Sequence, residues 1–316
     1  MERQFAQNFL LQAAYVGAHA SHGKETVNLN PSQYIPGSSL GTDQRRIFQG
    51  YAAINMDSQS GNSSYHSLQV ALKKRLSHGV SVNVAYTFSK SIDDYPNGGG
   101  NADVGADSSS AMPWYFPNGR LLDRGPSGFD HQHRLVTSYI WLLPRLAHFH
   151  PVLRGILGEW EASGILTLQT GDPMTVTAGF DRSLTALTND RADVISGQPV
   201  RSSTVCGAAV NCISWFNPAA FSGPKNAGGS FVADGNFGNV GKGALRGPGL
   251  VNFDAGLSKN FTLHESWKLQ FRGEFFNAIN HVNPNNPDAT LNSPQFGKIT
   301  AVGAARVGQL ALKLMF

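Results

Sequence analysis

Arg-Val-Gly-Gln-Leu-Ala-Leu-Lys-Leu-Met-Phe, residues 306–316, is the stretch that decides the fold. Side chains of a β-strand point alternately to opposite faces, so three leucines and the final phenylalanine share one face. The other face is mixed and carries a charge: Gln309, Ala311, Lys313 and Met315. Such a strand suits a half-buried position in a soluble domain. It also suits the wall of an outer-membrane barrel, with lipid on one side and water or polar protein on the other.

The position of this strand favours the membrane alternative. The sequence stops on an aromatic residue directly after the alternating leucines, with no tail beyond the strand. This ending resembles the terminal signal by which bacterial outer-membrane barrels are recognised for insertion. We therefore expect a carboxyl-terminal assembly signal, with the barrel-assembly machinery as its partner and outer-membrane lipid around it. Its residues are Leu310, Leu312, Leu314 and Phe316.

The composition argues against several other classes. Charged residues make up 15% of the 316, which is low for a soluble protein of this size, and the net charge of +4 comes without a basic cluster, so no nucleic acid is expected. No apolar run reaches the ~18 residues that a transmembrane helix requires. The start of the chain lacks the apolar core of a signal peptide. The chain is therefore either soluble and cytoplasmic or a piece whose amino-terminal portion is missing.

Seven further stretches alternate in the same way. The clearest pair, 63–76 and 80–89, is separated only by a short turn, which predicts an antiparallel hairpin. A second hairpin is predicted from 251–262 and 266–278. Three more strands are predicted at 8–17, 133–143 and 158–170.

Long and short connections alternate between these strands. The long ones span 18–62, 92–132, 171–250 and 279–304, and shorter ones lie between them. Outer-membrane barrels have short periplasmic turns and long external loops, whereas irregular connections of this length are uncommon in compact soluble domains. The expected fold class is all-β, an antiparallel up-and-down transmembrane β-barrel wall in the bacterial outer membrane.

The second face of the predicted strands carries polar and charged residues, and these residues indicate the size of the barrel. The interior of an eight-stranded barrel holds only packed side chains, and buried charges there are costly. Unpaired edges in lipid cost on the order of tens of kcal/mol each. We therefore expect about eight strands of a larger barrel with a wet or plugged lumen. The residues expected to face that lumen are Lys73, Arg75, Lys268, Gln270, Arg272, Glu274 and Lys313.

Eight short segments run in order through nearly the whole chain. They are Tyr-Val-Gly-Ala-His at 15–19, Asn-Ser-Ser-Tyr-His-Ser-Leu-Gln at 62–69, Ala-Tyr-Thr-Phe-Ser-Lys-Ser-Ile-Asp-Asp at 85–94, Phe-Asp-His-Gln-His-Arg at 129–134, Trp-Phe-Asn-Pro-Ala-Ala-Phe at 215–221, Phe-Gly-Asn-Val-Gly at 237–241, Leu-Arg-Gly-Pro-Gly at 245–249 and Leu-Gln-Phe-Arg-Gly-Glu-Phe-Phe-Asn-Ala-Ile-Asn-His at 269–281. Together they resemble the carboxyl-terminal barrel part of TonB-dependent receptors of the Oar-like group.

The resemblance implies a barrel of about 22 strands with an amino-terminal plug. It also implies energised uptake, through contact between a TonB box and the inner-membrane TonB complex. Compared with that family, this sequence lacks the plug, the TonB box, the signal peptide and most of the barrel. Residues 1–316 are therefore expected to be a partial outer-membrane barrel domain that meets the TonB complex only through the missing amino-terminal part.

The two cysteines are close in sequence. Cys206 and Cys212 lie in the longest predicted loop, which is external in the barrel interpretation. Exported proteins meet an oxidising compartment, so a disulfide is expected there, the alternative being two free thiols.

Residues typical of catalysis or metal binding are weakly marked. His131 with His133, and His148 with His150, have the spacing of paired metal ligands, but no further ligand is marked, so ordinary loop histidines are expected. The glycine-rich residues 235–243 lack a following Lys-Ser/Thr and lie in a long loop. A Gly-x-Ser-x-Gly elbow is also absent from the sequence, so neither an enzyme nor a cofactor is expected.

Aromatic residues lie near the predicted strand ends. An interfacial girdle at both membrane surfaces would place them there, and ordinary β-propensity is the alternative. The residues are Tyr86, Phe88, Trp141, Trp160, Trp267 and Phe316.

Two classes of function remain open on the sequence alone. One is the wall and external loops of a plugged transporter, and the other is a surface barrel whose loops bind partners. A soluble β-sandwich enzyme is a distant third. An upstream reading frame that encodes a plug would separate the first two, and no loop motif names a substrate.

Overall fold

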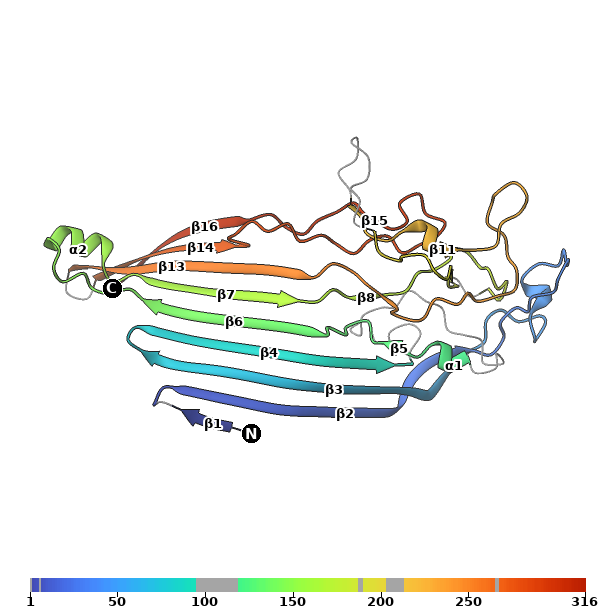
Figure 1. Cartoon of the computed structure of the whole chain (residues 1–316), viewed down its shortest axis with the longest axis horizontal. Helices are drawn as coiled ribbons and strands as arrows, with labels where there is room; N and C mark the ends of the chain where they lie inside the picture. The colour runs from blue at the N-terminus through green and yellow to red at the C-terminus, as the bar shows by residue number, and fades with distance from the viewer. Residues whose placement is uncertain (1, 6, 95–118, 187–189, 203–212, 265–266) are drawn as a thin grey trace.

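A single antiparallel sheet of long strands dominates the chain (Figure 1). The computed structural model describes residues 2–5, 7–94, 119–186, 190–202, 213–264 and 267–316. The long strands are β2 (Phe9–Asn28), β3 (Asn55–Ser77), β4 (Val80–Asp93), β6 (His133–Leu142), β7 (Glu161–Gln169), β13 (Leu250–His264), β14 (Trp267–Phe276) and β16 (Val307–Met315).

The order of the strands follows the chain. The sheet runs β1-β2-β3-β4-β6-β7-β13-β14-β16, where β1 (Glu2–Phe5) is a short first strand and β5 (Gly125–Pro126) pairs with β4. All eight predicted strands are present, and each pairs antiparallel with its neighbours. The predicted antiparallel sheet of successive strands is therefore confirmed.

The connections separate the two ends of the sheet. Those of β2–β3, β4–β6, β7–β13 and β14–β16 leave from one end, here called the loop end (Figure 1). Those of β3–β4, β6–β7 and β13–β14 leave from the other, here called the turn end. The predicted separation of long and short connections is therefore present.

Two strands are longer than the sequence predicted. β2 and β3 remain paired as far as Asn28 and Asn55, within the stretch 18–62 that was expected to be irregular. The pairing passes through register shifts around Gly23. The added segments are rich in Ser, His and Asn, so hydrogen bonding of the backbone defines them rather than an apolar face.

The register divides the sheet into two faces, because directly paired residues of antiparallel strands lie on the same side. One row across five strands is mostly polar: Lys73, Asn83, Ser138, Ile165 and Asp254. The next row points to the opposite side and is mostly apolar: Leu72, Val84, Thr137, Leu166 and Phe253. We call these sides the polar face and the apolar face.

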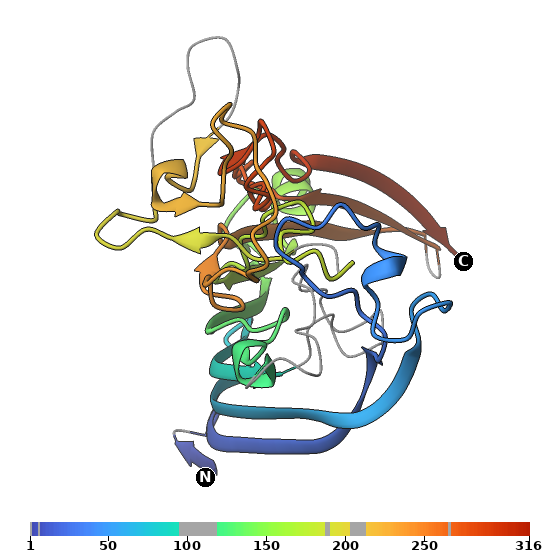
Figure 2. The same ribbon diagram turned by 90° about the vertical axis from the view of Figure 1, so that its right-hand side faces the viewer.

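The sheet is curved and does not close on itself. Figure 2 looks at the loop end, and the strands form an arc that is open between the first strands and β16. The order of the sheet has β1 at one edge and β16 at the other. Both edges therefore present unpaired backbone groups within the described residues.

Short elements lie in the connections. They include α1 (Gly119–Leu122) at the loop end and α2 (Pro151–Leu157) at the turn end, two 3-10 turns (Asp43–Arg45 and Pro218–Ala220), and the two-residue strand pairs β8–β12 (Pro173–Met174, Leu245–Arg246), β9–β11 (Asp193–Val194, Phe221–Ser222) and β10–β15 (Ile213–Ser214, Lys298–Ile299). None of the helices among the described residues is long and apolar enough to cross a membrane.

Candidate functional site

The polar face carries most of the residues that the sequence assigned to a lumen. Six of the seven lie on it by register: Lys73, Lys268, Gln270, Arg272, Glu274 and Lys313. Arg75 lies where the β3–β4 register shifts, between Lys74 and Ser77. Its backbone N–H donates to the carbonyl of Asn8 at 2.8 Å. That this face borders a lumen stays a prediction.

Charged groups on the polar face form an ion pair and a hydrogen bond with neighbouring side chains of the same face. The Arg272 guanidinium lies 2.5 Å from one carboxylate oxygen of Glu274. The amide of Gln309 donates to the other oxygen at 2.5 Å. The Arg272 side chain is still 55% exposed, so these groups remain hydrated at the surface of the wall.

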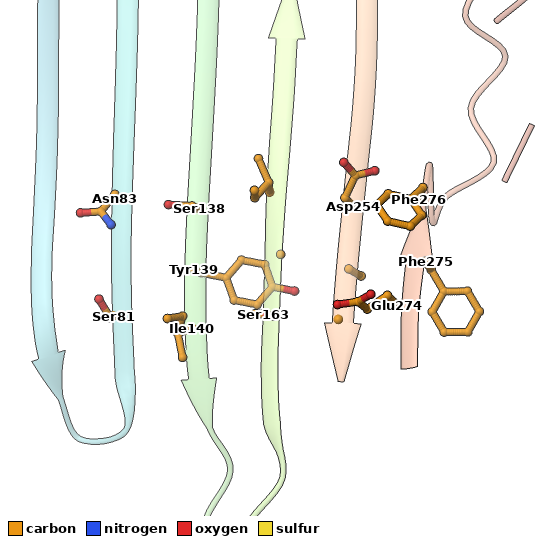
Figure 3. A pocket seen from close by; sticks show the side chains of 14 residues that line it. Ser81, Asn83, Ser138, Tyr139, Ile140, Ser163, Asp254, Glu274, Phe275 and Phe276 are labelled. Carbon is orange, nitrogen blue, oxygen red and sulfur yellow. The ribbon is translucent and has the colours of Figure 1, made fainter. Parts of the chain in front are cut away.

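Three hollows follow the polar face, and their position identifies it as the concave side of the arc. Figure 3 shows one of them, with side chains from β4, β6, β7, β13 and β14 across its floor. Its polar lining includes Asn83, Ser138, Ser163, Asp254 and Glu274. These hollows are stretches of open wall, and they offer hydroxyl, amide and carboxylate groups to whatever fills the arc.

The apolar face is bounded by polar side chains at both ends. At the turn end, Lys74 donates from Nζ to the carbonyl of Val80 at 2.6 Å. At the loop end, the Tyr15 hydroxyl and His66 Nδ1 are 2.6 Å apart. The Tyr86 hydroxyl and His133 Nδ1 are 2.8 Å apart. These Tyr–His pairs could not be predicted from sequence patterns, because their partners lie 51 and 47 positions apart and are brought together by the register of the strands.

Four of the six aromatic residues predicted for a girdle lie at or beside strand ends, all at the turn end: Trp141, Trp160, Trp267 and Phe316. Tyr86 and Phe88 lie in the middle of β4, which continues to Asp93, and they pack beside His133, the first residue of β6. At the turn end, the Trp267 and Phe316 ring centroids are 6.0 Å apart. Trp160 there packs edge-on against Phe271, with centroids 5.8 Å apart, and Trp141 ends β6. An interfacial role for these residues stays a prediction.

The residues predicted as an assembly signal lie on an edge strand. Register places Leu310, Leu312 and Leu314 on the apolar face of β16, where they are 71%, 69% and 45% exposed. Phe316 follows β16 and is 89% exposed. Recognition of this strand by an assembly partner stays a prediction.

Connections at the loop end fold together into one structure, which we call the loop assembly. It comprises 29–54, 119–132, 277–306 and the described parts of 170–249. The Arg45 guanidinium donates to the carbonyl of Leu184 at 2.6 Å and so joins the first of these connections to the longest. The N–H of Trp215 donates to the carbonyl of Gly297 at 2.7 Å and joins the longest to the last.

The loop assembly contains the hydrophobic core of the described residues. The Phe221 ring packs edge-on against Phe216 and Phe296, at centroid separations of 6.4 and 5.6 Å. The core residues are all less than a tenth exposed: Val176, Ala192, Phe216, Ala220, Phe221, Val240 and Phe296. A loop structure with a packed core holds its surface in a fixed shape.

Buried ion pairs tie the loop assembly to the wall and to itself. Lys242 pairs with Asp93 at the end of β4, with side chains 2% and 6% exposed. Arg246 pairs with Asp130, whose side chain is 2% exposed. Arg191 Nη2 lies 2.6 Å from Asp123 Oδ1, with side chains 3% and 5% exposed. These pairs could not be predicted from sequence patterns, because their partners lie 68 to 149 positions apart.

A third arginine joins two acidic residues of the longest connection. The Arg182 guanidinium lies 2.7 Å from Asp193 and 2.8 Å from Asp234. Burial opposes ionisation of Asp234, but hydrogen bonds from Arg182 and Asn236 prevail and lower its pKa to about 2. The same carboxylates raise the pKa of Arg182 despite its burial. This cluster therefore stays charged across the physiological range of pH.

Asp190 behaves in the opposite way. Burial raises its pKa to about 6, although its Oδ2 accepts the N–H of Ser183 at 2.6 Å. Its Oδ1 is buried and has no hydrogen-bond partner among the described residues. Because the folded-state pKa lies above the usual value of 3.8, protonation favours the folded loop assembly.

We expect the loop assembly to resist proteolysis better at pH 5 than at pH 7.5. The stabilisation from Asp190 is complete below its ordinary pKa and is lost as the pH rises through about 6. Between pH 5 and pH 7.5 the difference is about 1.4 kcal/mol, because pH 5 lies about one unit below the folded-state pKa. Asp190→Asn removes the ionisation and should abolish the pH step. Limited proteolysis of outer membranes at both pH values measures it, and a step that persists in Asp190→Asn contradicts the assignment.

Further candidates from the sequence are the two cysteines and the paired histidines, of which His131 and His150 make ordinary loop contacts. Cys206 and Cys212 lie outside the described residues. His131 Nδ1 is 3.1 Å from the carbonyl of Thr170, and His150 accepts the N–H of Val152 at 3.4 Å. No group of metal-ligating side chains is found in the described part of the chain.

The glycine-rich stretch 235–243 is part of the packing of the loop assembly. Gly238 has φ +77°, and a Cβ added there would lie 2.0 Å from the carbonyl oxygen of Arg191. The neighbouring Val240 is 1% exposed in the core. A glycine of this stretch therefore allows two backbone segments to pack closely against each other in this structure.

Comparison with known proteins gives a family and a distant structural likeness. The profile of the family "Outer membrane beta barrel domain" matches residues 1–309. The solved structure of the outer membrane transporter YddB from Escherichia coli aligns with 99% of this chain at 10% sequence identity and a TM-score of 0.48. The alignment covers 31% of the YddB chain, so this chain spans less than a third of that protein. No curated protein matches the sequence.

Proposed function

Because this chain belongs to the outer membrane beta barrel domain family and is a protein of the outer membrane, we propose that it forms part of the wall and external loops of a TonB-dependent receptor of the Oar-like group. Such a receptor takes up a substrate with energy from the inner membrane. The observation that carries the proposal is the polar, charged face that continues across the whole concave side of the sheet.

The charge on this face supports a wide lumen. An interior closed by eight strands is filled by side chains, and desolvation of Lys73, Lys268, Arg272 and Lys313 there would oppose folding strongly. The unpaired edges at β1 and β16 add to this argument, since lipid satisfies no backbone group. Further strands beside both edges, around a plug that contacts the inner-membrane TonB complex, meet both requirements.

The spacing of polar residues on the apolar face supports its contact with lipid. His66 and Lys74 are eight positions apart on β3, and the apolar-face residues between them are Leu68, Val70 and Leu72. Eight residues span about 27 Å along a strand, or about 20 Å of height at a tilt of ~40°. This is close to the apolar band of ~25 Å in outer-membrane barrels. The loop end then lies outside the cell and the turn end in the periplasm.

Adjacent residues of β4 test this orientation. We expect Asn83→Cys to react with a water-soluble maleimide in outer-membrane fragments, because Asn83 lies on the polar face. Val84→Cys, one position away on the apolar face, should react only with a lipid-soluble maleimide. Both variants are made in the native protein with Cys206→Ser and Cys212→Ser. Equal labelling of the two positions by the water-soluble reagent would contradict the proposed wall.

Energised uptake needs a separate test. Cells with and without the gene are grown on a medium of mixed peptides and oligosaccharides, and depletion of each compound is followed by mass spectrometry. We expect the deletion to slow depletion of at least one compound, and a protonophore to slow it equally in cells that keep the gene. Depletion profiles that do not differ between the strains would contradict uptake.

The loop assembly favours a second candidate function, a surface barrel whose loops bind a partner. Its packed core and buried ion pairs fix an outer surface that bears several exposed aromatic residues, including Phe48 (50%) and Tyr51 (67%). A barrel of this kind needs no energy from the inner membrane. Loss of cell adhesion or partner capture in the deletion strain, with uptake unchanged, would favour it.

A further inference from the structure

A short helix at the turn end carries an apolar stripe with no protein against it in the described residues. α2 is Pro-Val-Leu-Arg-Gly-Ile-Leu, and none of its residues is buried. The stripe consists of four helix residues at the helical spacing i, i+1, i+4 and i+5, and Phe149 precedes the helix. The stripe residues and their exposed fractions are Val152 (61%), Leu153 (48%), Ile156 (53%) and Leu157 (53%), and Phe149 is 52% exposed.

The helix is fixed to the apolar face of the wall. Lys259 lies on that face, directly paired with Phe271, yet it is only 4% exposed. Its Nζ donates to the carbonyls of Gly158 and Ile156 at the end of α2. The ammonium also lies 5.6 Å from the centre of the Trp160 ring. Lys259 is thus a positioning residue that holds α2 beside the wall rather than below it.

Trp160 completes the attachment. Its indole N–H donates to the carbonyl of Ile156 at 2.9 Å. Its ring packs edge-on against Phe261 and Phe271 of the apolar face, with centroids 6.5 and 5.8 Å apart. The exposed stripe of α2 is therefore next to the surface that, in the proposed function, meets lipid.

We infer that α2 is an interfacial helix that inserts its apolar stripe into the periplasmic leaflet of the outer membrane. The inference rests on the lipid-facing side of the proposed wall, because that side is continuous with the stripe. In the segment 143–160, Arg145 pairs with Glu159 at 3.0 Å, which leaves Arg154 of the helix as the cation for the anionic headgroups of that leaflet. Amphipathic helices of this composition lie in the membrane plane at the boundary of headgroups and acyl chains.

Fluorescence quenching by spin-labelled lipid tests the inference. The native protein, with Cys206→Ser and Cys212→Ser, receives a single bimane label at Val152→Cys or at Arg154→Cys. The first position lies in the stripe and the second on the opposite side of the same helix. The protein is reconstituted into vesicles of phosphatidylethanolamine and phosphatidylglycerol that contain acyl-chain nitroxides. We expect a large loss of fluorescence at Val152→Cys and a small one at Arg154→Cys.

A label on the wall separates this inference from the proposed function. Leu257→Cys lies on the apolar face of β13, where Leu257 is 40% exposed. Quenching at Leu257→Cys without quenching at Val152→Cys overturns the inference and leaves the proposed wall intact. Absence of quenching at both positions overturns both. Self-quenching at Val152→Cys that rises with the labelled fraction would show a second copy on the stripe, and it also overturns the inference.

Substitution of Lys259 tests how the helix is held. Lys259→Gln removes the cation that caps the carbonyls of Ile156 and Gly158. We expect quenching at Val152→Cys to fall toward the value at Arg154→Cys, while quenching at Leu257→Cys is unchanged. Quenching at Val152→Cys that is unaffected by Lys259→Gln would overturn the positioning role of this lysine.

Discussion

Leu166→Arg will prevent most of the native protein from assembling in the outer membrane, whereas Thr167→Arg will not. The two positions are adjacent in β7 and lie on opposite faces. Leu166 lies on the apolar face opposite Phe253, and Thr167 lies on the polar face opposite Asn252. An arginine in the middle of a lipid-facing band costs about 2–4 kcal/mol. That lowers the ratio of assembled to unassembled protein about 30-fold to 1,000-fold.

Heat-modifiable gel mobility and resistance to urea extraction measure the assembled fraction. Thr167→Arg introduces the same side chain at nearly the same height in the wall, so it controls for general effects of arginine on expression and export. Equal loss of assembly in both variants would show that the two faces of β7 meet similar surroundings. Equal tolerance would have the same meaning, and either result would contradict a wall with lipid on one side only.

The sheet could be predicted from the sequence because the side chains of its two faces differ in polarity. Leu310, Leu312 and Leu314 alternate with Gln309 and Lys313, and a similar period recurs in the other long strands that the sequence predicted. A face that needs an apolar partner imposes a period of two on the sequence. The extensions of β2 and β3 beyond residues 17 and 63 have no apolar face to cover. Their sequence therefore shows no alternation of apolar and polar residues.

The loop assembly could not be predicted because its contacts join distant positions. Its core brings Val176, Phe216 and Phe296 together from three short irregular segments. No periodicity marks a residue that is buried by a turn rather than by a strand or helix. The ion pair of Lys242 with Asp93 likewise depends on how the longest connection folds back over β4.

Several segments that carry the resemblance to Oar-like receptors have structural roles here. Asp130 of 129–134 accepts the N–H of Ser91 at 2.6 Å and pairs with Arg246 of 245–249. Trp215 and Phe216 of 215–221 pack in or against the loop core. These motifs hold the loops to the wall and identify no substrate, which is why a family resemblance left the ligand open.

The largest effect on the loop assembly should come from breaking the pair of Asp123 and Arg191. Both side chains are at most 5% exposed, and Arg191 Nη1 also donates to the carbonyl of Leu122 at 2.6 Å. Asp123→Ala removes the carboxylate and leaves a buried guanidinium without that counter-charge, which costs about 3–5 kcal/mol. The wall does not depend on this pair. We therefore expect trypsin to cut the loops of Asp123→Ala in intact cells, while heat-modifiable mobility persists.

Two further variants separate charge from packing. Asp57→Ala breaks the exposed pair with Lys24, whose side chains are 60% and 65% exposed, and a surface pair contributes at most about 1 kcal/mol. Its loops should stay resistant to trypsin. Asp123→Leu combined with Arg191→Met replaces both charges by apolar groups, which removes the desolvation cost together with the attraction. We expect this double variant to regain most of the lost resistance, because the cost lies in the unpaired charge. Loops of the double variant that are cut as fast as those of Asp123→Ala would mean that the geometry of the pair, rather than its neutralisation, holds α1 against the longest connection.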